Sequence, residues 1–333
     1  MTPSAGRANS SVELPDDAFS PAPGGNESCA FCGSATEVSL AGVVDNRLGT
    51  PGTYEIRRCL CCGLEQTAPR PSLVQLKALY EGHYNFGEKE KSLYSKLRER
   101  FLFSFLYRLW VRVDGDVAFH QRRGTGLLLD IGCNEGRGLR MYARNGFRVE
   151  GLELNETAAS TARSAGFNVY TCPLENFAPA ASYDVAVLSN VLEHSLDTRK
   201  MLRVVHEILT PGGQVWISCP NSQSWQRSVF GRSWLNWHVP FHIVHFSSMT
   251  LRQSLEDAGF THIELRQVSP ALWMAQSLIV YCFSGSGRKT RQLRNPFLTL
   301  FFMLLARCVL FPALWFGNRI GRGDCLIAVA TKA

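Results

Sequence analysis

The first 25 residues lack the apolar core of a secretory signal, so we expect a chain that is not exported. One long basic tract is also missing, although the formal net charge is +7, and this argues against a nucleic-acid-binding tail. No internal repeat is visible. The 333 residues suit one large domain with a smaller one, and 45% hydrophobic with 19% charged residues describe an ordinary folded protein.

Composition divides the chain into four parts. Residues 1–26 are rich in Pro, Ser, Gly and Ala, and we expect them to be disordered. Residues 27–70 form a short unit punctuated by cysteines. Residues 71–123 carry leucines and aromatic residues at three- and four-residue steps, which predicts helices. Residues 124–333 form the large domain.

The large domain alternates strand and helix patterns. GLLLDIG reads as a buried strand that ends in a turn, and GLRMYARNGF reads as a helix closed by glycine. Five more strands follow, with helices between most of them, the last of the five being a short strand at residues 263–268. DCLIAVATKA closes the sequence as an apolar strand. This alternation predicts an α/β fold with a doubly wound, mostly parallel sheet.

The turn after the first strand, in LLLDIGCNEGRG, points to a cofactor. A dinucleotide fingerprint G-x-G-x-x-G fails because Asn134 and Arg137 stand where it needs glycine. Asp130, Gly132 and Gly136 instead fit the D-x-G-x-G-x-G turn of an S-adenosylmethionine site, from which only Asn134 departs. Asparagine visits left-handed backbone conformations readily, so we expect binding to be kept.

An acidic residue near the end of the second strand supports a nucleoside cofactor. The carboxylate of Glu153 can accept hydrogen bonds from both ribose hydroxyls. Such an acid serves dinucleotides as well as S-adenosylmethionine, so Glu153 by itself does not choose between them.

Four further stretches resemble class I S-adenosylmethionine-dependent methyltransferases, and above all ubiquinone-type O-methyltransferases. They are SYDVAVLSNVLEHSLD, LTPGGQVWISCPN, the block from His238 that ends in "AGF", and GDCLIAVATKA. The resemblance implies a Rossmann-like, seven-stranded sheet and an enzyme that uses S-adenosylmethionine. It also implies the cofactor-binding set Asp130, Gly132, Cys133, Asn134, Gly136, Glu153, Leu154, Leu174, Glu175, Ser189 and Asn190.

Glu193 and His194 follow the fourth strand, where the methyl group is expected. His194 is the first candidate for a general base, because histidine titrates near neutral pH; a purely structural histidine is the alternative. In ubiquinone-type relatives an ExxEH pattern is associated with a divalent metal, but Asn190 occupies its first position here. Metal assistance at this place is therefore not predicted.

A second histidine group lies in WHVPFHIVHF. His238 and His242 have the i, i+4 spacing of helical metal ligands, but Pro240 between them disfavours a regular helix. We expect a loop over the active site that places His242 or His245 near the substrate. The alternative is a structural role for these residues.

Two CxxC pairs, Cys29 with Cys32 and Cys59 with Cys62, predict a zinc ribbon. In a chain that is not exported, thiols stay reduced, so paired cysteines are metal ligands rather than disulfides. Cys61 is a spare thiol that could compete for a ligand position. A similar arrangement occurs in methyltransferases that resemble the first 85 residues, whereas a nucleic-acid-binding zinc unit is the alternative.

An apolar helical insertion at about 271–318 contains the stretch Pro296–Phe316, whose length approaches that of a bilayer span. Arg307 and Pro312 interrupt it, and basic residues flank it on both sides. An in-plane helix or hairpin at a membrane surface fits this pattern, and so does a helical pair packed on the domain or on a second subunit. We expect a cytoplasmic protein that meets the inner face of the membrane only peripherally.

These observations favour a methyltransferase whose acceptor is a hydroxyl on a small molecule, a sugar or a lipid-linked intermediate. Transfer to carbon or nitrogen stays open, as does a zinc-ribbon binding protein whose Rossmann-like half has lost catalysis. A nucleic-acid substrate is disfavoured because SNVLEH does not read as NPPY or DPPY.

Overall fold

The computed structural model describes residues 28–83, 99–285 and 289–333. The predicted disorder of residues 1–26 lies outside the described residues, as does most of the helix predicted around Leu93 and Leu97.

A seven-stranded sheet forms the centre of the large domain. Its strands are β4 (Leu127–Ile131), β5 (Arg148–Leu152), β6 (Asn168–Tyr170), β7 (Tyr183–Ser189), β8 (Leu209–Pro220), β10 (Phe260–Val268) and β11 (Cys325–Lys332). The order across the sheet is β10-β11-β8-β7-β4-β5-β6. The five strands from β8 to β6 are parallel, and β11 and β10 are antiparallel. The predicted mostly parallel, doubly wound sheet is confirmed.

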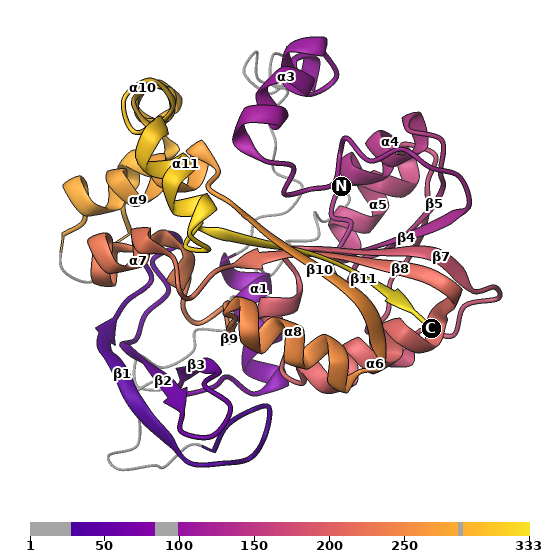
Figure 1. Cartoon of the computed structure of the whole chain (residues 1–333), viewed down its shortest axis with the longest axis horizontal. Coiled ribbons are helices and arrows are strands. Elements are labelled where there is room, and N and C mark those ends of the chain that lie inside the picture. The colour runs from indigo at the N-terminus through magenta and orange to yellow at the C-terminus, as the bar shows by residue number, and fades with distance from the viewer. Residues whose placement is uncertain (1–27, 84–98, 286–288) are drawn as a thin grey trace, which may run out of the picture.

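Helices cover both faces of this sheet. Figure 1 shows α4 (Arg137–Arg144) and α5 (Glu156–Ser164) on one side, and α6 (Thr198–Ile208) and α8 (Ser248–Asp257) on the other. Local sequence fixes where the helices begin. The Asn155 side chain accepts a hydrogen bond from the Ala158 N–H at the start of α5, and Ser247 forms a capping box with Thr250 at the start of α8.

The cysteine unit forms a second, four-stranded sheet. Strands β1 (Thr36–Val43), β2 (Tyr54–Cys59) and β3 (Glu65–Ala68) are joined by β9 (Val244–His245), which comes from the large domain. The Thr67 hydroxyl also donates a hydrogen bond of 2.6 Å to the carbonyl of His242. The histidine loop is therefore attached to the cysteine unit by strand pairing, a connection that sequence spacing did not indicate.

The remaining helices are additions to this core. They are α1 (Leu73–His83), α3 (Phe105–Asp114), α7 (Trp225–Phe230), α9 (Ala271–Phe283), α10 (Pro296–Cys308) and α11 (Phe311–Arg319). The apolar helical insertion predicted at about 271–318 corresponds to α9, α10 and α11.

The expectation that residues 71–123 are helical is only partly met. After α3 the chain turns at Gly115, which has a φ of 96°, and it is irregular up to residue 126. The Asp116 carboxylate holds this segment by accepting hydrogen bonds from the N–H groups of His120 and Gln121, so a side chain replaces the helical backbone bonds.

Among the described residues, no single helix has both the length and the apolar character needed to cross a membrane. The pair α10 and α11, bent by 66° at its break, meets that test jointly by length and composition.

Candidate active site

The turn between β4 and α4 has the backbone shape that its residues allow. Gly132 and Gly136 have φ values of 74° and 77°, and Asn134 between them has a φ of 51°. All three are in the left-handed region, which asparagine tolerates better than most residues. The Asn134 side chain is exposed. The departure from the glycine pattern therefore leaves the shape of the turn intact.

Two glycines of this turn are required by close neighbours. A Cβ atom on Gly138 would lie 2.6 Å from Oδ2 of Asp130, and a Cβ atom on Gly132 would lie 2.7 Å from Cγ2 of Val191. Glycine therefore permits the Asp130 carboxylate to pack under the start of α4. It also allows the segment after β7, which carries Val191, to lie directly on the cofactor turn.

Glu153 is fixed at the end of β5 by backbone donors. Its Oε2 accepts a hydrogen bond of 2.9 Å from the N–H of Asn134, and its Oε1 accepts one of 2.8 Å from the N–H of Asn155. Burial raises its pKa, while these hydrogen bonds oppose the rise. Each oxygen keeps a lone pair for another donor. The carboxylate therefore fits the ribose-binding role that the family resemblance implies.

Asp130 is the most deeply buried acid of the turn. Burial, and next the nearby Glu153 carboxylate, raise its pKa to about 8. A buried carboxyl of this kind suits a cationic ligand, because a positive charge would recover the ionised form. The α-ammonium and sulfonium groups of S-adenosylmethionine have that charge.

The other implied cofactor residues differ in exposure. Cys133 and Leu174 are buried, Ser189 and Asn190 are half-buried, and Leu154 and Glu175 are exposed. The Ser189 hydroxyl donates to the Val117 carbonyl at 3.1 Å and accepts from the Ser218 hydroxyl at 3.2 Å. Ser189 therefore connects the end of β7 to the segment before β4, so its hydroxyl is already occupied by protein partners.

Three histidines meet beyond the end of β7. The His194 and His242 ring centroids are 4.7 Å apart, and those of His238 and His242 are 4.9 Å apart, both nearly perpendicular. His245, the other residue expected near the substrate, instead pairs with the Thr67 hydroxyl at 2.9 Å and packs on Trp237. The structure therefore brings His242, rather than His245, to His194.

A chain of hydrogen bonds fixes the tautomer of His242. Its Nδ1 lies 2.8 Å from the carbonyl oxygen of Asn236, and a carbonyl can only accept, so Nδ1 carries the proton. The Asn236 side-chain amide in turn donates to Asp324. The lone pair of neutral His242 is then on Nε2, which lies 3.9 Å from Oε1 of Glu193.

Glu193 is almost completely buried, with 1% of its surface exposed. Neither carboxylate oxygen has a hydrogen-bond partner among the described residues. Burial raises the pKa of Glu193 to about 8, so the protonated form dominates at neutral pH. A buried acid without a protein partner is unusual and marks a place where a substrate group or water can bind.

Burial lowers the pKa of His194 to about 4, although a hydrogen bond with the Phe241 main chain opposes the shift. This differs from the expectation of titration near neutral pH. The ring is therefore neutral at pH 7, the form that can accept a proton. Its Nδ1 lies 2.8 Å from the Tyr80 hydroxyl of α1.

Sequence reasoning missed Tyr80. In the sequence it is only one of the residues at helical spacing between residues 71 and 123. Nothing in that spacing indicates that a helix after the cysteine unit meets a residue 114 positions later.

The donor atoms of Glu193, His194 and His242 lie within 4.8 Å of one another. Three such donors could surround a metal ion, although Asn190 departs from the ExxEH pattern that is associated with a metal.

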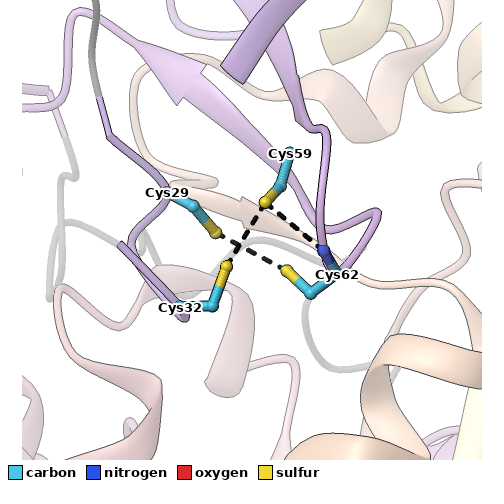
Figure 2. A group of neighbouring side chains, drawn as sticks. All are labelled: Cys29, Cys32, Cys59 and Cys62. Carbon is cyan, nitrogen blue, oxygen red and sulfur yellow. Dashed lines mark hydrogen bonds between the residues drawn. The ribbon is translucent and has the colours of Figure 1, made fainter. Parts of the chain in front are cut away.

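The four predicted cysteine ligands converge, as Figure 2 shows. The Cys29 and Cys62 sulfurs are 3.6 Å apart, and those of Cys32 and Cys59 are 3.4 Å apart. These separations are too long for disulfides. They are close to the spacing of about 3.8 Å that tetrahedral Zn–S bonds of about 2.3 Å impose.

The two CxxC turns, Cys29–Cys32 and Cys59–Cys62, have the same construction, and each is called a knuckle below. Gly33 and Gly63 both have positive φ, and their N–H groups donate to the carbonyls of Cys29 and Cys59. Backbone N–H groups of Phe31 and Cys62 approach the sulfurs of Cys29 and Cys59 at 3.4 Å. Cys61, the spare thiol, is exposed and outside this cluster. The set fits a Zn²⁺ ion.

The fold and the turn define the class of protein, a nucleoside-cofactor-binding enzyme. Its features are a seven-stranded α/β sheet, a left-handed turn after the first parallel strand, and a buried acid after the second. Residues 94–265 match the family model described as "Methyltransferase domain". The chain belongs to this family and is a class I S-adenosylmethionine-dependent methyltransferase.

Curated relatives agree with this assignment. A "Ubiquinone biosynthesis O-methyltransferase" of Erwinia tasmaniensis is 31% identical over 34% of this chain and 51% of its own length. A "Probable S-adenosylmethionine-dependent methyltransferase" of Mycolicibacterium smegmatis is 33% identical over 40% of this chain and 51% of its own. The chain thus spans about half the length of these relatives. A solved "SAM-dependent methyltransferase, possible histamine N-methyltransferase" of Thermotoga maritima is similar over 72% of this chain and 99% of its own, with 18% identity and a TM-score of 0.44.

Proposed function

We propose that this methyltransferase acts on a hydroxyl of a small-molecule, sugar or lipid-linked acceptor. The observation that carries the proposal is the buried group formed by Tyr80, Glu193, His194 and His242 beside the cofactor turn. Val191, two residues before Glu193, packs against Gly132, so the group is adjacent to the turn at which we expect the cofactor to bind. When bound, S-adenosylmethionine supplies a methyl group on a positively charged sulfur.

The acceptor proton has a defined destination in this arrangement. His194 is neutral at pH 7, and its Nδ1 is in hydrogen-bond contact with the Tyr80 hydroxyl. A bound hydroxyl can pass its proton to Tyr80 while Tyr80 passes its own proton to Nδ1 of His194, because the other ring nitrogen is engaged with the Phe241 main chain. Positioned proton transfer of this kind contributes about 10²–10⁴-fold to a rate. Glu193 and the Nε2 atom of His242 can orient the acceptor, because one is a protonated donor and the other an acceptor.

Carbon and nitrogen acceptors are the rival substrates. A secondary or primary amine needs the same proton removal, and so does a carbon acid, so the buried group alone does not exclude them. The hydroxyl is favoured because the curated relatives that name an acceptor atom name oxygen, as in "Ubiquinone biosynthesis O-methyltransferase". This comparison concerns only about a third of the chain.

The same proposal includes a structural Zn²⁺ ion held by Cys29, Cys32, Cys59 and Cys62. Such an ion would bind the two knuckles of a unit too small to have a full core of its own. Its effect on catalysis is indirect, because the zinc-bearing sheet holds the histidine loop through the β3–β9 pair.

The test of the hydroxyl proposal uses S-adenosylmethionine with an isotopically labelled methyl group. The protein is incubated with fractionated cell extract, and the labelled product is analysed by mass spectrometry and NMR. A methyl ether is expected, and a methyl ester, or label on nitrogen or carbon, would refute methylation of a hydroxyl. His194→Gln should bind the cofactor normally and lose most turnover, whereas His206→Gln, on α6, should keep it.

A further inference from the structure

The helices α10 and α11 present an apolar face that nothing in the described chain covers. On α10 the exposed residues recur at i, i+3, i+4 and i+7, and Phe297 is 81% exposed. We define the α10–α11 face by its exposed side chains. They are Phe297, Leu300, Phe301 and Leu304 on α10 and Phe311, Trp315 and Phe316 on α11.

The opposite side of the helix pair is held by the domain. Ala306 and Leu314 are buried in the cluster that contains Trp237 and Phe241, two residues of the WHVPFHIVHF segment. The pair therefore has one side in the protein core and one side in solvent. An inserted pair packed on the domain was one of the sequence-based alternatives, and the buried side of the pair agrees with it.

Arg307, the charge that interrupts the apolar stretch, does not belong to the exposed face. Its guanidinium pairs with the Asp114 carboxylate at the end of α3 and donates to the Ser269 carbonyl at 2.7 Å. Its side chain is almost buried. The exposed face of α10 therefore carries no charge, and the ion pair fastens α10 to α3, so neither helix can leave the domain without exposing a charge.

Basic residues border this face at both ends. Arg291 and Arg294 are exposed before α10. Arg319 is exposed at the end of α11, and Arg322 is exposed just after it. The sequence has no Asp or Glu from residue 265 to residue 323. The Arg319 guanidinium lies 4.9 Å from the centre of the Trp315 ring, so a cation and an indole are placed together at the edge.

We propose that the α10–α11 face is a peripheral docking surface for an anionic membrane. Apolar side chains would enter the acyl boundary while the bordering arginines contact lipid phosphates, as in amphipathic interfacial helices. A bilayer span is disfavoured, because the buried half of the pair would have to separate from the core and carry Arg307 into lipid.

A second copy of the chain is the main rival occupant. A symmetric dimer through this face would bring the arginines of both copies together without any acidic residue of the segment between them. An anionic lipid surface supplies the missing negative charge. If the proposed acceptor is lipid-linked, this surface would bring the active site to it, and only that last step depends on the proposed function.

Vesicle flotation with the full chain tests the proposal and requires neither cofactor nor acceptor. The wild type should float with phosphatidylcholine vesicles that contain phosphatidylglycerol. Its binding to vesicles of phosphatidylcholine alone should be weaker by about tenfold or more. Binding should fall as salt rises. Phe297→Ser with Phe301→Ser and Leu304→Ser should reduce binding about tenfold or more, and so should Arg291→Glu with Arg294→Glu.

Matched variants on a distant surface provide the controls. Met249→Ser on α8 and Arg203→Glu on α6 change exposed residues of the same kinds and should bind vesicles like the wild type. All variants should bind S-adenosylmethionine normally, which separates this result from any failure of the methyl-transfer proposal. A wild type that never floats, or a dimer that the triple serine variant makes monomeric, would overturn the membrane assignment.

Discussion

The Tyr80 hydroxyl lies 2.8 Å from Nδ1 of His194 and joins α1 to the turn after β7. The helix that follows the cysteine unit thus contributes to the candidate site, and its Leu79 is buried in one cluster with Tyr54 and Ile56 of the small sheet. His194 pairs with Tyr80 while the Phe241 main chain contributes a second hydrogen bond. The imidazole is therefore held in one orientation before any acceptor binds.

Removing the Tyr80 hydroxyl should slow methyl transfer without affecting the cofactor. We expect Tyr80→Phe to lower kcat by about tenfold to a hundredfold, because His194 loses its hydrogen-bond partner and the proton loses its relay to the imidazole. The dissociation constant for S-adenosylmethionine, measured by calorimetry, should not change, since Tyr80 does not line the turn.

A double-mutant cycle distinguishes a shared role from two separate ones. If Tyr80 acts through His194, adding Tyr80→Phe to His194→Gln should cause little further loss of kcat. Multiplicative losses would show that the two residues act independently, and full activity in Tyr80→Phe would remove this hydrogen bond from the mechanism.

The cysteine cluster predicts one zinc ion per chain. Cys62→Ser should lose the metal and unfold at lower temperature, because three remaining thiolates bind zinc more weakly and the small sheet depends on the ion. Cys61→Ser is the matched control, since its exposed thiol lies one position away and outside the cluster. Elemental analysis of reduced, unchelated protein measures the ratio; a value well below one, or equal loss in both variants, would contradict the zinc proposal.

Much of the large domain could be predicted because its signals are local. Strand and helix periodicity between residues 126 and 260 predicted the parallel sheet, and the spacing from Asp130 to Gly136 predicted a tight turn after its first strand. Asn134 could be accommodated because its left-handed backbone is a property of the residue itself. The grouping of the four cysteines could be predicted in the same way, since their ligand chemistry depends on the spacing within each CxxC pair.

The relationships that the sequence did not reveal are those between distant segments. The β3–β9 pair joins Glu65 to His245, and the Tyr80–His194 contact spans 114 positions. Burial, which no local pattern specifies, moves the pKa of His194 to about 4. The same limit applies to Arg307, which reads as an interruption in an apolar helix until its partner Asp114 is seen.

Cofactor affinity should rise with pH up to about pH 8. In the free protein, burial and Glu153 raise the pKa of Asp130 to about 8, so the acid is mostly protonated at neutral pH. A cationic ligand prefers the carboxylate, so binding releases a proton and is weaker at low pH, by at most about tenfold per pH unit. Calorimetry from about pH 6 to about pH 9 should show this slope flattening above pH 8.

Asp130→Asn tests the origin of that slope. The variant should bind S-adenosylmethionine more weakly at high pH and with little pH dependence, because the amide cannot ionise. A wild type with constant affinity over the range, or an unchanged slope in the variant, would show that Asp130 does not titrate on binding.

Gly138 and Gly82 form a pair of helical glycines with opposite expected effects on alanine substitution. A Cβ atom on Gly138 would lie 2.6 Å from Oδ2 of Asp130 and 3.2 Å from the Tyr142 ring, so Gly138→Ala must displace a buried acid and should cost about 1–3 kcal/mol. No atom of the described residues lies within 4 Å of the corresponding position on Gly82, in α1. Gly82→Ala should therefore stabilise the protein by up to about 1 kcal/mol through helix propensity alone.

Denaturant unfolding measures both changes, and cofactor affinity should fall only in Gly138→Ala. Equal stability of the two variants would mean that Asp130 has room to move, and the packing of its carboxylate under α4 would then not be what requires glycine at this position.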